Sequence, residues 1–228
     1  LETEHSDLQF ASVHNNAVTP CEQSRVLRAA FEDRGQESCP EFRMMDKILF
    51  LNACIRPCSR TLELAEALLQ RLQGDIREVR LQEASLSALD LDGMEKRHRA
   101  AQNQDFSDAL FDAAKQFADA DILVIAAPYW DLMFPAVLKT YWENITVSGI
   151  TFRYSEQGRP QSLCRAKELY YVTTAGGPIF ANMGFDYVAA LCRGFYGISE
   201  VTCIKAEGLD IIGADVEAIL DEAKGNIT

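Results

Sequence analysis

The 228-residue sequence lacks several features that mark whole classes of protein. It contains no run that approaches the roughly 18 consecutive apolar residues of a membrane-spanning helix, so we expect no membrane insertion. Its net charge of -12 is opposite in sign to the basic surfaces that bind nucleic acid or anionic lipid, so we expect neither partner. No basic start is followed by the apolar segment of a secretion signal, and we therefore expect a cytoplasmic protein.

Signals for a metal site are also missing. The sequence has only three histidines, and its seven cysteines are scattered without the spacing of a zinc site. Cys54 and Cys58 form a C-x3-C pair, which is not a recurrent ligand spacing. We predict no metal, and we interpret the cysteines as reduced thiols that are mostly buried.

From residue 46 onward, short apolar segments alternate with amphipathic ones. The predicted strands are 48–52, 76–81, 122–127, 169–174 and 201–205. The predicted helices are 59–73, 89–120 (mostly helical), 135–143, 179–196 and 214–223. The segment ILVIAA at 122–127 is apolar at every position, as expected for a strand covered on both faces of a parallel sheet. This alternation predicts an α/β fold with a doubly wound, five-stranded parallel sheet.

Glycine is missing where a dinucleotide-binding fold would need it. The Rossmann strand order requires a G-x-G-x-x-G turn after the first strand, but this chain has NACIRPCSRT at 52–61. That absence favours the flavodoxin-like strand order, 2-1-3-4-5. The longer connection at 148–167 contains GITFRY, which predicts one further short strand.

Residues 1–44 differ from the rest of the chain. They lack a sustained period apart from a short helical stretch at 22–33. Met44 and Met45 stand directly before the first strand, so we interpret 1–44 as a poorly structured N-terminal extension and 45–228 as the domain. Two origins remain open for the extension: a non-native upstream segment, or a genuine regulatory or docking arm.

Ligands of open parallel sheets bind beyond the carboxyl ends of the strands. The loop after the first strand ends at a predicted helix N-terminus, where free N–H groups and the helix dipole favour an anion. Arg56, Ser59, Arg60 and Thr61 add two guanidinium groups and two hydroxyls, which suit a phosphate. Ser59 could equally be a simple N-cap.

Two further loops reach the same edge. Pro128, Tyr129 and Trp130 place aromatic rings where they can cover a planar ligand or merely cap the core. Gly176 and Gly177 allow a close approach of the backbone to a ligand or form a tight turn. Together the three loops predict a pocket for a flat ring with a phosphate tail.

Three stretches of the sequence, KILFLNACIRPCSRTLELAEALL, ADILVIAAPYWDLMFPAVLKTYWENITVSGITFRY and YYVTTAGGP, resemble the flavodoxin-like NAD(P)H-dependent oxidoreductases. That family includes FMN-dependent azoreductases and NAD(P)H–quinone reductases. The resemblance extends from about residue 45 to the end. It implies that FMN carries the chemistry, with NADH or NADPH as co-substrate and a quinone, azo or nitroaromatic molecule as electron acceptor. No catalytic side chain is then expected. The resemblance also implies a homodimer with the active site at the subunit interface.

The resemblance also assigns the cofactor contacts to individual residues. The phosphate is expected at Arg56, Ser59, Arg60 and Thr61. The flavin ring is expected beside the second and third loops, at Pro128, Tyr129, Trp130, Asp131, Leu132, Thr174, Ala175, Gly176 and Gly177.

The sequence departs from the family pattern at two positions. Cys54 replaces a small polar residue, and Asp131 replaces an asparagine found in many azoreductases. A carboxylate near the flavin would disfavour an anionic reduced ring. An alternative function is a flavodoxin-like electron carrier, whose acidic surface would dock on basic partners. A second alternative is a family member that has lost flavin and acts as a binding module.

Overall fold

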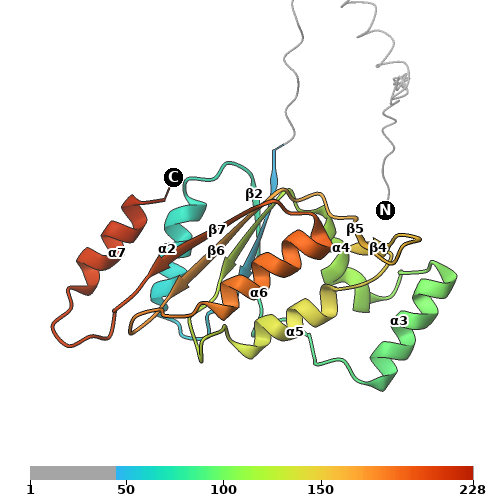
Figure 1. Cartoon of the computed structure of the whole chain (residues 1–228), viewed down its shortest axis with the longest axis horizontal. Coiled ribbons are helices and arrows are strands. Elements are labelled where there is room, and N and C mark those ends of the chain that lie inside the picture. The colour runs from blue at the N-terminus through green and yellow to red at the C-terminus, as the bar shows by residue number, and fades with distance from the viewer. Residues whose placement is uncertain (1–44, 228) are drawn as a thin grey trace, which may run out of the picture. The chain divides into compact units, whose positions relative to one another are not determined.

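The computed structural model describes residues 45–227. Five parallel strands form the central sheet: β1 (Lys47–Asn52), β2 (Asp75–Arg80), β3 (Ile122–Ala126), β6 (Glu168–Thr174) and β7 (Glu200–Ala206). Their order is β2-β1-β3-β6-β7 (Figure 1). Numbered among themselves, the five strands follow 2-1-3-4-5, so the predicted flavodoxin-like order is confirmed. The predicted extension 1–44, with its helical stretch at 22–33, lies outside the described residues.

Helices cover both faces of this sheet. They are α2 (Arg60–Leu69), α3 (Leu91–Asn103), α4 (Asp112–Asp119), α5 (Ala136–Ile145), α6 (Met183–Leu191) and α7 (Val216–Gly225). Side chains alternate between the two faces of a strand, and β1 divides accordingly. Ile48 and Phe50 belong to the core cluster under α2 and α7, whereas Leu49 and Leu51 belong to the cluster under α4, α5 and α6.

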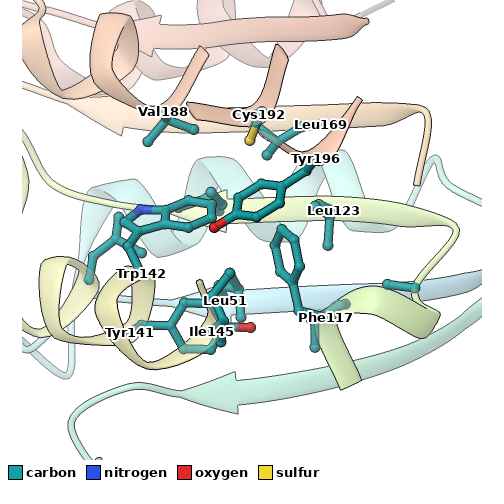
Figure 2. Close-up of a cluster of buried hydrophobic side chains, with 14 of the residues drawn as sticks. Leu51, Phe117, Leu123, Tyr141, Trp142, Ile145, Leu169, Val188, Cys192 and Tyr196 are labelled. Atoms are coloured by element: carbon teal, nitrogen blue, oxygen red, sulfur yellow. The ribbon is translucent and has the colours of Figure 1, made fainter. Parts of the chain in front are cut away.

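Aromatic side chains fill the core on the α5 and α6 side (Figure 2). Trp142 stacks on Tyr196, with ring centroids 6.0 Å apart and planes 14° from parallel. Phe117 meets the Tyr196 ring edge-on at 4.9 Å. Tyr196 ends the short π-helix η2 (Cys192–Tyr196) that follows α6. These contacts join α4, α5 and η2. They fix the position of α5, which begins directly after the loop that follows β3.

The prediction that 89–120 is mostly helical is confirmed, but the helix is interrupted in its middle. Helix α3 ends at Gln104, whose φ of 52° is left-handed, and the chain forms a loop before the 3-10 turn η1 (Ala109–Phe111). The carboxylate of Asp105 accepts from the Ser107 N–H, and that of Asp108 accepts from the Leu110 N–H. Such local bonds compete with helical ones and end the helix.

The connection before β6 contains a hairpin. Strand β4 (Phe152–Tyr154) pairs antiparallel with β5 (Pro160–Ser162). The short strand predicted from GITFRY is therefore confirmed, although its partner was not predicted. The helix predicted over 179–196 begins later, at Met183, and ends in η2.

The described part of the chain also tests two expectations from composition. No helix within residues 45–227 is both long enough and apolar enough to cross a membrane. Five described cysteines are free thiols; Cys54, Cys164 and Cys192 are buried, Cys203 is half-buried and Cys58 is exposed. Cys21 and Cys39 lie outside the described residues.

Candidate functional site

The loops after β1, β3 and β6 leave the sheet at the same edge. Backbone bonds continue the ladder one residue past the strands, from Ala53 N to Ala126 O, from Ala127 N to Val172 O and from Ala175 N to Ala206 O, each 2.9 Å long. The strands therefore end level with one another. The three loops then surround a cavity of about 320 Å³.

Ten predicted residues line this cavity: Arg56, Ser59, Arg60, Thr61, Pro128, Tyr129, Trp130, Thr174, Ala175 and Gly176. Asp131, Leu132 and Gly177 do not line it. The lining is completed by four residues that sequence reasoning did not select: Ile55, Cys58, Leu209 and Asp210.

The start of α2 forms one wall. Ser59 is the N-cap, with an extended backbone at φ -86° and ψ 121°, and its Oγ accepts from the Leu62 N–H at 3.4 Å. The cap leaves other N–H groups of the first turn without intrahelical acceptors, and the dipole of the helix makes this end positive. The N-cap interpretation of Ser59 is confirmed, and the capped helix end faces the cavity; phosphate binding by Ser59 stays a prediction.

Thr61 lies deeper in the same wall. Its side chain is buried, and its Oγ1 lies 2.6 Å from Oγ1 of Thr174 at the end of β6. The two hydroxyls join the first and third loops at the base of the cavity.

The two arginines of the first loop differ in their surroundings. Nη1 of Arg60 donates to the Asp210 carboxylate at 2.7 Å and to the Leu209 carbonyl at 3.1 Å. Arg56 forms no ion pair with any residue between 45 and 227. The cavity therefore combines one paired and one unpaired guanidinium.

The loop after β3 contains a tight two-residue turn. Trp130 and Met133 exchange two backbone hydrogen bonds, of 3.1 and 2.7 Å. Between them Asp131 and Leu132 have φ values of 51° and 68°. Positive φ at both central positions defines a type I′ turn, which normally uses Asn-Gly. A leucine is strained in this conformation, and strained backbone clusters at functional sites.

This turn holds the two aromatic residues differently. Trp130 lines the cavity and is 39% exposed. The Tyr129 hydroxyl donates to the Ala181 carbonyl at 2.8 Å, which connects the second loop to the continuation of the third. Asp131 is exposed at the tip of the turn, outside the cavity lining.

Gly176 leaves space that the protein itself fills. A Cβ on Gly176 would lie 2.3 Å from Oδ2 of Asp210. A Cβ on Gly177 would meet no atom within 4 Å. We predicted that a ligand could approach the backbone closely at Gly176. In this structure the Asp210 carboxylate lies close to Gly176.

The cysteines of the first loop do not form a reactive pair. Both are free thiols, and Cys54 is buried with its Sγ 3.7 Å from the Ala126 carbonyl. Burial raises the pKa of the Cys54 thiol to about 11, although a hydrogen bond with Ser59 opposes the shift. This thiol is therefore protonated at neutral pH and is a poor nucleophile. Within the described residues no group of histidine, cysteine or acidic side chains could hold a metal ion.

A larger cavity, of about 1110 Å³, lies elsewhere in the described part of the chain. It runs along β2 and α4, from Lys47 and Asp75 at the amino ends of the strands to Ser87 and Asn144. Ligands of parallel sheets bind at the opposite, carboxyl edge, where the loops described above converge. We therefore assign the function to the smaller cavity.

A model of the flavodoxin-like fold matches residues 46–228. The chain is 36% identical over 189 residues to an FMN-dependent NADH:quinone oxidoreductase of Clostridium acetobutylicum, which covers 77% of this chain and 93% of that protein. This chain belongs to the flavodoxin-like family. An FMN-dependent NADH:quinone oxidoreductase of Clostridium perfringens is 31% identical over 188 residues, with 78% of this chain and 94% of that protein covered.

A solved structure is similar in fold to this chain. The azoreductase of Bacillus anthracis superposes with a TM-score of 0.70 at 26% identity, over 80% of this chain and 97% of that one. The family resemblance predicted from the sequence motifs is confirmed, and so is the fold that it implied.

Proposed function

We propose that this chain is an FMN-dependent NADH oxidoreductase that reduces quinone, azo or nitroaromatic acceptors. One observation carries the proposal: a cationic helix start and an exposed tryptophan line one cavity at the carboxyl edge of the sheet, and a strained turn follows that tryptophan directly. The names of the two Clostridium relatives, both FMN-dependent NADH:quinone oxidoreductases, support it.

The residues present fit such a cofactor. The first turn of α2, with Arg56 and the Ser59 hydroxyl, would hold the phosphate. The exposed face of Trp130 would pack on the ring, and the backbone of Asp131 and Leu132 would approach its polar edge. Thr174, Ala175, Gly176 and Gly177 would border the other side of the ring.

When bound, FMN supplies the electron-transfer chemistry, and the protein binds and orients the reactants. The cavity side chains are suited to binding. Burial raises the pKa of the nearby Cys54 thiol to about 11, so this thiol is protonated at neutral pH. We therefore assign no side chain as a general base or nucleophile.

We further propose that the protein is a homodimer. Phe180 is 81% exposed and Met183 is 53% exposed, and both flank Ala181, which bonds the Tyr129 hydroxyl beside the cavity. Large exposed apolar side chains mark interaction surfaces. A second copy seated here would cover them and enclose the acceptor side of the site. Light scattering coupled to size-exclusion chromatography would test this, with a monomer mass contradicting it.

Three finer assignments complete the proposal. Residues 45–228 form the FMN-binding domain, and 1–44 are an extension. The protein acts in the cytoplasm, which suits its free thiols. NADH is the donor named for the relatives, and we retain NADPH as an alternative donor.

The test is to purify the protein with FMN and follow NADH and NADPH oxidation with and without menadione. Turnover that depends on menadione is expected. Bound flavin without nicotinamide oxidation would instead favour an electron carrier, which the net charge of -12 also suits. Failure to bind FMN would leave only a flavin-free binding module.

A further inference from the structure

The loop after β7 is a fourth component of the site. Three backbone hydrogen bonds join it to the loop after β6: Gly208 N to Gly177 O at 3.2 Å, Leu209 N to Ala175 O at 3.2 Å, and Asp210 N to Gly176 O at 2.8 Å. Gly208 has a φ of 79°, which lets the chain turn at this point. The backbone of Asp210 is therefore held against the wall of the cavity.

The Asp210 side chain reaches back across this wall. Its Oδ2 lies over Gly176, in space that a side chain there would take, and its Oδ1 accepts from Nη1 of Arg60 at 2.7 Å. The same Nη1 donates to the Leu209 carbonyl at 3.1 Å. Arg60 thus spans from the first turn of α2 to the fourth loop and is held there by two acceptors.

The pairing with Asp210 distinguishes Arg60 from Arg56, the other arginine of the cavity. The charge of Arg60 is compensated by Asp210, whereas Arg56 is unpaired within residues 45–227. A phosphate that took Arg60 from Asp210 would leave a carboxylate beside a dianion, and like charges at short range repel. A phosphate on Arg56 would not have to replace an ion pair, because Arg56 forms none with residues 45–227.

We propose that Arg60 and Asp210 form a clamp that positions the fourth loop, and that Arg56 is the side chain that pairs with the phosphate. This inference rests on the proposed function, because it assumes that FMN is the ligand. It gives different roles to two arginines that the sequence analysis treated alike. Arg60 and Asp210 act on the whole flavin as positioning residues, and Arg56 acts on the phosphate alone.

Riboflavin and FMN separate these roles, since they differ only in the phosphate. Dissociation constants for both would be measured by quenching of flavin fluorescence, at low and high salt. The variants are Arg56→Gln, Arg60→Gln, Asp210→Ala and the double variant Arg60→Gln/Asp210→Ala. Arg153→Gln is the matched control: it removes the same charge from β4, where Arg153 bonds Gln161 outside the cavity. Circular dichroism would verify that each variant is folded.

We expect Arg56→Gln to weaken the binding of FMN about tenfold, because it removes a charge-assisted bond to the phosphate. The affinity for riboflavin should not change. The salt dependence of FMN binding should fall with it. Arg60→Gln and Asp210→Ala should each weaken the binding of FMN and of riboflavin by the same factor. The double variant should be no weaker than either single variant, since both remove the same clamp.

Other outcomes would overturn the inference. A selective loss of FMN in Arg60→Gln would make Arg60 a phosphate ligand. A selective gain of FMN in Asp210→Ala would make Asp210 a competitor of the phosphate. Equal binding of FMN by all variants would refute the clamp and leave the proposed function intact. A wild-type protein that binds neither flavin would refute both.

Discussion

The hydroxyls of Thr61 and Thr174 lie face to face at the base of the cavity, with their Oγ1 atoms 2.6 Å apart. Thr61 belongs to the first turn of α2 and Thr174 ends β6, so the contact joins segments 113 residues apart in the chain. Both residues are buried. Since a buried hydroxyl without a partner is costly, each threonine depends on the other.

We expect Thr61→Val to lower the free energy of unfolding by about 1–3 kcal/mol, because it leaves the Thr174 hydroxyl buried and unpaired. The double variant Thr61→Val/Thr174→Val should lose less than the sum of the single variants, because no orphaned hydroxyl remains. Urea denaturation would measure all three. Thr202→Val is the control, since Thr202 is exposed on β7 and should change little. Additive losses would contradict the pairing.

The turn at Trp130–Met133 gives a second prediction. Leu132 has a φ of 68°, which a β-branched residue tolerates worse than leucine does and asparagine tolerates better. We expect Leu132→Asn to be more stable than Leu132→Val by about 1 kcal/mol or more. Thermal unfolding would compare the two variants.

Leu163 provides the control for that comparison. It is 38% exposed, and it is not among the described non-glycine residues with positive φ. The apolar side chain should be the better choice there, so Leu163→Val should equal or exceed Leu163→Asn in stability. The same order of stability at both positions would mean that φ is not the cause.

Much of the fold could be predicted from local patterns in the sequence. The apolar run at 122–127 predicted β3 because a central parallel strand is buried on both faces. The missing glycines at 52–61 predicted the strand order because the two doubly wound folds differ in the loop after their first strand. The break at Gln104 was not predicted, since the apolar stripe resumes at Ala109 and Leu110 and looks continuous.

The site was predicted only in part, for a related reason. The loops after β1, β3 and β6 have distinctive compositions. The loop after β7, which contains Leu209 and Asp210, does not. Their place beside the cavity depends on the pairing of β7 with β6 and on the reach of Arg60. The position of β7 next to β6 was the available signal, because it brings the end of β7 to the same edge. The type I′ turn was missed because Asp-Leu is not its usual sequence.

Two fully buried tyrosines should differ in how much stability is lost when the hydroxyl is removed. The Tyr141 hydroxyl has no hydrogen-bond partner within residues 45–227, whereas that of Tyr196 lies 2.6 Å from Oγ1 of Thr146. Burial raises the pKa of both phenols, so both are neutral over the usual pH range. We expect Tyr141→Phe to be neutral or stabilising and Tyr196→Phe to cost about 1 kcal/mol. Chemical denaturation of both variants would measure this, and a larger loss in Tyr141→Phe would reveal a partner for its hydroxyl.

Glu207 should make stability depend on pH. Its carboxylate accepts from Lys205 Nζ at 2.5 Å and from the Ile179 N–H at 2.6 Å, and these bonds hold the pKa of Glu207 below its usual value. A lowered pKa in the folded state means that this stabilisation is fully present above the unfolded value, about 4.3, and is lost as the pH falls through the folded value. We expect the difference in Tm between wild type and Glu207→Gln to shrink as the pH falls from about 5 to about 3. Glu222→Gln is the control, because Glu222 is exposed and forms no ion pair with any residue between 45 and 227. If the difference in Tm stays constant over this pH range, the charge of Glu207 does not stabilise the loop that contains Ile179.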